Sequence, residues 1–168
     1  MQFKIRLATA ENCGELAQVK RKVWETTYRG IYPDEKIDNF DFSLQEKKFA
    51  EIIADKSINL YAVFDENGSI IGYMSCGRPL RKFKDYEQEI GLLYLLAPYQ
   101  GNGLGKRLFL LANERIKNNG YNEFFISCNK YNLKAQKFYE KMGGIKIHTD
   151  EGAEDKSIPQ VKYHYHVT

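Results

Sequence analysis

The chain has 168 residues, of which 43% are hydrophobic and 28% charged, and its formal net charge at pH 7 is +3. These values favour one domain spanning residues 1–168 with a substantial core, and they argue against a nucleic-acid-binding protein, which needs a concentrated basic face. The three cysteines form no CxxC pair, which argues against a cysteine zinc site. The N-terminus has no signal-peptide core, and no window is apolar enough for a membrane span. A cytoplasmic protein that does not bind a membrane is therefore expected.

The first half of the chain predicts two helices and a β-hairpin. Residues Phe3–Ala8 alternate apolar and polar side chains, which is typical of a strand, and Thr9 fits the N-cap of a following helix. The segment 28–35 breaks that helix, and a second helix is expected from about residue 43 to 56. Two strand-like runs flank Asp65–Gly68, where an Asn-Gly pair favours a tight turn. The apolar face of the first helix carries Leu16, Val19, Val23 and Trp24.

The second half of the chain alternates predicted strands and helices. The expected elements are a solvated linker at 81–87, a strand at 88–96, a glycine-rich loop, a helix to about residue 118, a strand at 122–129, a helix at 133–142 and closing strands at 145–148 and 160–168. The full order is β-α-α-β-β-β-α-β-α-β-β. This order predicts an α/β fold with a mixed sheet flanked by helices.

The glycine-rich loop, "QGNGLGK" from Gln100 to Lys106, lies between a strand and a helix, where loops often bind phosphate. The stretch from Gly101 to Lys106 is one residue shorter than the magnesium-nucleotide pattern GxxxxGK[ST], and Arg107 replaces its hydroxyl residue. The dinucleotide pattern GxGxxG requires a glycine where Lys106 stands. Both of these nucleotide sites are therefore disfavoured.

A third pattern fits the loop. Gln100, Gly103 and Gly105 match Q/R-x-x-G-x-G/A, and the later segment "NLKAQKFYEKMG" from Asn132 to Gly143 matches N-x-x-A-x-x-F-Y-E-K-x-G. On these two motifs, and on its opening segments, the chain resembles the small bacterial members of the GCN5-related N-acetyltransferase (GNAT) family. It departs from the family at Gly144, where an aromatic residue is usual.

The resemblance implies a central splayed mixed β-sheet that binds acetyl-CoA as co-substrate, without a metal. Gly103 and Gly105 lack a Cβ and would let the pyrophosphate approach the backbone at a helix N-terminus. The pantetheine arm would pair with the backbone of Leu93 to Leu95 like an added strand. The residues assigned to the cofactor are Leu93, Tyr94, Leu95, Gln100, Gly101, Asn102, Gly103, Leu104, Gly105, Lys106, Asn132 and Tyr139.

The resemblance also implies direct acetyl transfer to a primary amine in a ternary complex. Tyr139 would protonate the departing thiolate, since a phenol keeps its proton at neutral pH, although packing beside Phe138 would also explain a tyrosine there. Glu89 would be the general base, although a carboxylate exposed at a strand end explains it equally well, and Glu87 is the alternate. A covalent route would use Cys128 as the acetyl carrier.

Several alternatives stay open at this point. The stripe of Trp24, Tyr28 and Tyr32 would line an amine pocket or belong to the core. His164 and His166 share one strand face, but no third metal ligand is evident. Asn132 fits a helix N-cap as well as a CoA contact. The surface lysines that could meet the 3′-phosphate of CoA or simply be solvated are Lys134, Lys137 and Lys141.

The acceptor is not identified by the sequence. It would be a small-molecule amine or an amine of a peptide or protein, and the family suggests a homodimer. The competing class of function is a sensor or partner module that binds acetyl-CoA without catalysing its transfer.

Overall fold

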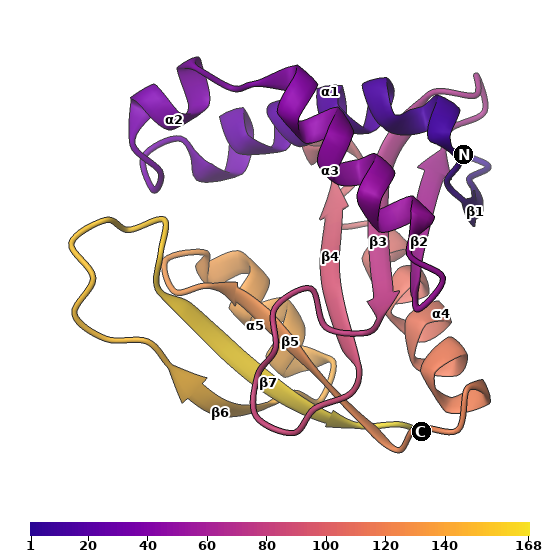
Figure 1. The fold of residues 1–168 in the computed structure, drawn as a ribbon, viewed down its shortest axis with the longest axis vertical. Coiled ribbons are helices and arrows are strands. Elements are labelled where there is room, and N and C mark those ends of the chain that lie inside the picture. The colour runs from indigo at the N-terminus through magenta and orange to yellow at the C-terminus, as the bar shows by residue number, and fades with distance from the viewer.

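The computed structural model describes residues 1–168 and contains one seven-stranded sheet in the order β1-β2-β3-β4-β5-β7-β6 (Figure 1). Neighbouring strands are antiparallel except β4 and β5, which are parallel, so the predicted mixed sheet is confirmed. The strands are β1 (Lys4–Leu7), β2 (Ile58–Phe64), β3 (Ile70–Gly77), β4 (Glu89–Leu95), β5 (Glu123–Asn129), β6 (Ile145–Thr149) and β7 (Gln160–His166).

Helices flank the sheet on both faces, as the sequence predicts (Figure 1). None of them combines the length and the apolar character needed to cross a lipid bilayer. The α-helices are α1 (Cys13–Val23), α2 (Asp34–Asp38), α3 (Phe42–Ala54), α4 (Leu104–Asn118) and α5 (Leu133–Lys141). Three shorter helical turns are η1 (Ala10–Asn12), the π-helical η2 (Trp24–Tyr28) and η3 (Ala97–Tyr99).

The core consists of two apolar layers, one on each face of the sheet. Alternation along the central strands separates them, because successive side chains of a strand point to opposite faces. On β3, Tyr73 packs with the layer under α1 and α3, whereas Met74 packs with the layer under α4. The second layer continues across β5 and β7, where Phe124 and Tyr165 stack with ring centroids 5.1 Å apart.

The sheet opens between its two parallel strands. β4 pairs with β5 only through Glu89 with Phe125 and Ile90 with Ile126, whereas its pairing with β3 continues to Leu95. Figure 1 shows β4 and β5 diverging from this point. The rest of β4 therefore has no strand partner on its β5 side, which is the splay that the family resemblance predicts.

Two segments differ from the sequence prediction. The segment 28–35, expected only to break a helix, contains the start of the short helix α2, for which Pro33 is the N-cap residue. Thr9 precedes a 3₁₀ turn rather than α1 itself, and its backbone N–H donates to Asn12 Oδ1 at 2.9 Å. Both differences concern how the chain enters and leaves α1.

Gly144, the departure from the family pattern, lies beside Tyr165. A Cβ at position 144 would be 2.6 Å from the Tyr165 hydroxyl oxygen, and that hydroxyl donates to the Tyr139 carbonyl at 2.6 Å. Tyr165 thus fills the space that a side chain at position 144 would require, and it anchors α5 to β7.

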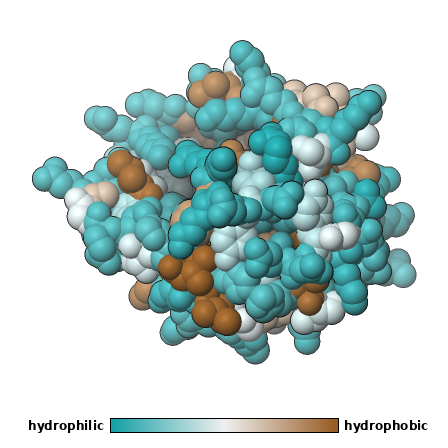
Figure 2. All heavy atoms as spheres, turned by 60° about the horizontal axis from the view of Figure 1, so that its bottom comes forward, coloured by the Kyte–Doolittle hydropathy of each residue, from teal (hydrophilic) through white to brown (hydrophobic).

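One outer face of the molecule is mostly hydrophilic. Figure 2 shows hydrophilic side chains covering most of it, with hydrophobic ones in small separate groups. Scattered apolar groups of this kind are ordinary on a surface that faces water.

Replacing Phe124 with alanine tests the core layer shared by α4, β5 and β7. Phe124 is fully buried, so the truncation should lower the free energy of unfolding by about 3–5 kcal/mol through lost burial and a residual cavity. Leu110 on the outer side of α4 is 47% exposed, and Leu110→Ala should change stability by only about 0.5 kcal/mol. Chemical denaturation measures both, and equal losses would contradict this account of the core.

Candidate active site

A cavity of about 1400 Å³ occupies the splay between β4 and β5. It extends from the start of α4 and α5 to the segment that links α1 to α2. Asn102 and Leu104, although assigned to the cofactor by the sequence, do not line it. The sequence-predicted residues that the structure brings together in its wall are Glu89, Leu93, Tyr94, Leu95, Gln100, Gly101, Gly103, Gly105, Lys106, Asn132 and Tyr139.

The glycine-rich loop presents backbone donors at the beginning of α4. Gly103 has φ of +86°, a conformation that side chains with a Cβ rarely adopt, and it lets the chain turn directly from the loop into the helix. Arg107 N donates to Gly103 O at 3.1 Å, so the N–H groups of Gly105 and Lys106 precede the first hydrogen bond of the helix. Such a helix start attracts anions.

Gln100 braces the loop rather than simply facing the cavity. Its Nε2 donates to Leu95 O at 2.8 Å, and its Oε1 accepts from Lys134 Nζ at 2.5 Å. These contacts tie the end of β4 to α5 across the cavity mouth. Of the three lysines considered for the CoA 3′-phosphate, Lys134 and Lys141 line the cavity, whereas Lys137 does not.

Glu89 is buried at the point where the sheet opens. Its side chain is 6% exposed, and Oε2 accepts a hydrogen bond from Leu80 N at 2.8 Å. Burial raises the pKa of this carboxyl to about 7, although the Leu80 bond and the charges of Lys162 and Arg81 act in the opposite direction. The alternative that Glu89 is merely an exposed carboxylate at the end of a strand is therefore wrong. Glu87, two residues earlier, is the exposed carboxylate.

Tyr139 also lies in the cavity wall, on α5. It is 6% exposed, and burial raises the pKa of its phenol well above the ordinary value. The hydroxyl therefore stays protonated across the physiological pH range. Asn132 caps the same helix, because its Oδ1 accepts from Ala135 N at 3.1 Å, which confirms the predicted N-cap.

Tyr28 also lies in the cavity wall and is buried, so it belongs to the core and to the cavity wall at once. It ends the π-helical turn η2, and such turns are frequent at functional sites. Its phenol is buried, which raises its pKa, and the neighbouring side chains of Asn132 and Tyr94 offset part of that rise. Tyr28 thus links the segment after α1 to the strand and helix that flank the splay.

Cys128 is not suited to carry an acetyl group. It is buried, and burial raises the pKa of its thiol to about 12. The nucleophile would be the thiolate, which is scarce at neutral pH under these conditions. The direct route is therefore favoured over the covalent one.

The wall formed by α1 to α3 combines aromatic and cationic side chains. Trp24 and Tyr32 both line the cavity and pack against each other with ring centroids 5.3 Å apart, so the aromatic stripe is core and cavity wall together. Lys20 Nζ donates to Gln45 Oε1 at 2.7 Å, and Lys36 Nζ lies 4.6 Å from the centre of the Tyr32 ring. Burial, with help from nearby lysines, lowers the pKa of Lys20 to about 8.

These lysines have no acidic partner. Neither Lys20 nor Lys36 takes part in any of the ion pairs of the structure. Lys162, on the β7 side of the cavity, bonds instead to Ser127 Oγ at 2.8 Å. The cavity therefore holds one buried carboxyl, Glu89, among several unpaired cations.

Comparison with solved structures places this architecture among acetyltransferases. The PaiA N-acetyltransferase of Thermoplasma acidophilum, solved in complex with coenzyme A, aligns over 99% of each chain with a TM-score of 0.79 and 22% sequence identity. The YncA protein of Salmonella typhimurium, solved with acetyl-CoA, aligns over 99% of this chain and 94% of its own with a TM-score of 0.71 and 16% identity. The predicted fold is thus confirmed.

Sequence relatives agree with the structural ones. YuaI of Bacillus subtilis, named as an uncharacterized N-acetyltransferase, is 31% identical over 73% of this chain and 69% of its own. A protein of Thermoplasma acidophilum named spermidine N(1)-acetyltransferase is 29% identical over 92% of this chain and 94% of its own. The family model described as an acetyltransferase (GNAT) domain matches residues 29–166. The chain therefore belongs to the GNAT family and is an acetyl-CoA-dependent acyltransferase of that family.

Proposed function

We propose that the protein transfers acetyl from acetyl-CoA to a primary amine by direct attack, with Glu89 as general base and Tyr139 as general acid. The observation that carries this proposal is the buried Glu89 carboxyl in the cavity wall, whose pKa is raised to about 7. A base whose pKa lies near the working pH is the most effective proton acceptor. Most surface carboxylates ionise far below that range.

In the proposed complex, acetyl-CoA lies along the open edge of β4. The free helix start at Gly103 to Lys106 would hold the pyrophosphate, and the unpaired part of β4 from Leu93 to Leu95 would bind the pantetheine arm. Lys134 and Lys141 line the same cavity and would approach the phosphates. This arrangement directs the thioester toward the point where β4 and β5 diverge.

The two proton transfers have separate groups. An alkylamine is mostly protonated at neutral pH, so Glu89, directly or through water, removes a proton before or during attack on the thioester carbonyl. The C–N bond forms as the C–S bond breaks, and the Tyr139 hydroxyl gives its proton to the departing thiolate. Tyr139 suits this role because burial keeps its phenol protonated.

The cationic wall points to the class of acceptor. Lys20 and Lys36 have no ion-pair partner beside the aromatic side chains of Trp24 and Tyr32, so an acceptor that carries a carboxylate or similar anion would pair with them. A polyamine, the substrate class named for the Thermoplasma acidophilum relative, would add ammonium groups next to these cations. We therefore favour an amino acid or a related amine that bears an anionic group.

Glu89→Gln tests the general base. The amide cannot accept the proton, so kcat/KM should fall by about 100- to 10,000-fold. In the parent enzyme the rate should drop as pH falls through about 7, where Glu89 becomes protonated, and this dependence should be absent in the variant. The ionisation of the acceptor amine affects both proteins alike, so pH–rate profiles of the pair isolate the role of Glu89.

Glu87→Gln is the matched control, because Glu87 is exposed two residues earlier, and it should leave the pH–rate profile unchanged.

The pH dependence of the free energy of unfolding gives a second test of the raised pKa of Glu89. Because folding raises the pKa of Glu89, the parent protein should lose stability as pH rises from about 4.3 to 7, and Glu89→Gln should not show this loss. A pH dependence of the rate that survives in Glu89→Gln would reject Glu89 as the base.

Tyr139→Phe tests the general acid. We expect kcat to fall by about 10- to 1,000-fold, while the Kd for acetyl-CoA, measured by calorimetry, stays nearly constant because only the hydroxyl is removed. Tyr131→Phe, at an exposed tyrosine just before the same helix, is the control and should change neither quantity. An unaltered kcat in Tyr139→Phe would exclude Tyr139 as the general acid.

The alternative function is tested with the parent protein. If it binds acetyl-CoA but acetylates no amine, a sensor or partner module would be favoured over an enzyme.

Lys20→Met tests the charge of the acceptor. With an anionic amine that the parent enzyme acetylates, the variant should raise KM by about tenfold or more with little change in kcat, since a charge-assisted hydrogen bond contributes about 1.5–3 kcal/mol. Lys22→Met, on the same helix but outside the cavity, should behave like the parent. Preferred turnover of spermidine over anionic amines by the parent enzyme would overturn this assignment.

A further inference from the structure

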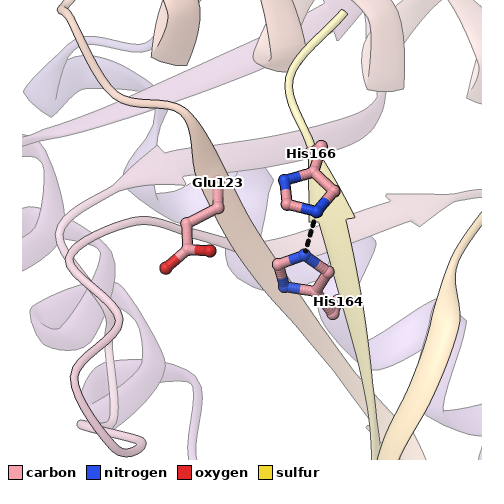
Figure 3. Close-up of side chains that lie close together, drawn as sticks. All are labelled: Glu123, His164 and His166. Carbon is pink, nitrogen blue, oxygen red and sulfur yellow. Dashed lines mark hydrogen bonds between the residues drawn. The ribbon is translucent and has the colours of Figure 1, made fainter.

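Two histidines and a glutamate meet on β5 and β7, outside the acetyl-CoA cavity (Figure 3). His164 and His166 are two residues apart on β7 and share a face, and Glu123 pairs with His166 across the β5–β7 ladder. One ligand atom from each of the three side chains lies within 4.8 Å of the other two. The strand pairing thus supplies the third donor that the sequence did not reveal.

The spacing of the two imidazoles matches that of ligands on one metal ion. Their Nε2 atoms are 3.2 Å apart and share a hydrogen bond, which a bound ion would replace. Two nitrogens bound tetrahedrally to zinc at about 2.0–2.1 Å would be separated by about 3.3 Å. The rings meet at 84°, and Figure 3 shows the two Nε2 atoms facing each other, with Glu123 on the neighbouring strand.

Tyr86 contacts the ring of His164 and helps to fix its orientation. Its hydroxyl lies 2.6 Å from His164 Nδ1, the ring nitrogen that does not face His166. A partner at the second ring nitrogen is the usual support of a metal-binding histidine, because it fixes the ring and leaves the other nitrogen free to bind. Phe125, which faces His164 across the ladder and packs against Tyr86, supports the same arrangement.

The third donor is free to complete a site. Glu123 is exposed and forms no ion pair in the structure, so its carboxylate can rotate toward the imidazoles at little cost. The lysine on the same face of β7, Lys162, is engaged with Ser127 and lies 4.9 Å from the centre of the Phe83 ring. The carboxylate therefore has no competing cation within the cluster.

We propose that Glu123, His164 and His166 form a site for a divalent transition-metal ion, with zinc as the best match. Two imidazoles and one carboxylate are ligands that zinc accepts, and three protein ligands leave a fourth position open to water or to an external ligand. None of the three residues lines the acetyl-CoA cavity, and none has a part in the acetyl-transfer chemistry proposed above.

Zinc titration of the tag-free protein tests this site. Calorimetry with zinc chloride should give one tight binding event, and thermal unfolding should shift to higher temperature as zinc is added, since an ion that binds only the folded state stabilises it. His164→Ala and His166→Ala should each weaken binding by about tenfold or more, and Glu123→Gln should weaken it measurably.

His148→Ala is the matched control, because His148 is also on a strand of this half of the sheet but pairs with Asp150 at 2.8 Å outside the cluster. It should bind zinc like the parent. The variants should keep the parent circular dichroism spectrum, so that a loss of binding is not a loss of fold. Absence of zinc binding to the parent, or equal binding by the His164→Ala/His166→Ala double variant, would overturn the proposal.

Discussion

The functional architecture depends on the divergence of β4 from β5 after only two paired residues, Glu89 and Ile90. Parallel strands that remained paired would satisfy their backbone groups against each other and leave no room between them. Because β4 stays paired with β3 on its other side, it keeps an extended strand conformation along its open edge. The same strand leads through the glycine-rich loop into α4, so one element presents both a free strand edge and a free helix start to the cavity.

Burial shifts the pKa values of ionisable side chains in the cavity wall, including Glu89 at the point where β4 and β5 diverge. Glu89 is removed from water beside the last β4–β5 pair and keeps a proton at pH values where an ordinary carboxyl has lost it. The pKa of Lys20, in another wall of the cavity, is lowered rather than raised, because burial disfavours the charged form of either group. A fold selected only for stability would avoid such groups or pair them. Perturbed acids and bases in one cavity are instead typical of sites that move protons and bind charged ligands.

The sequence predicted the order of strands and helices, the mixed sheet and the two motifs that flank the cavity, because periodicity and glycine positions are local properties. It did not predict α2 or the π-helical turn that brings Tyr28 to Asn132, since an i→i+5 turn depends on packing against the rest of the fold. It could not decide whether Glu89 was exposed, and it missed Glu123 beside His166. Burial and cross-strand register both arise from residues far apart in the chain.

In the proposed complex, acetyl-CoA occupies the splay with its thioester near Glu89 and Tyr139. A crystal structure of the complex with acetyl-CoA tests it most directly. We expect the pyrophosphate at the backbone N–H groups of Gly103 to Lys106, the pantetheine arm along Leu93 to Leu95, and the thioester sulfur within hydrogen-bonding reach of the Tyr139 hydroxyl. A complex in which acetyl-CoA binds outside the cavity, or with its thioester directed away from Tyr139 and Glu89, would contradict the account.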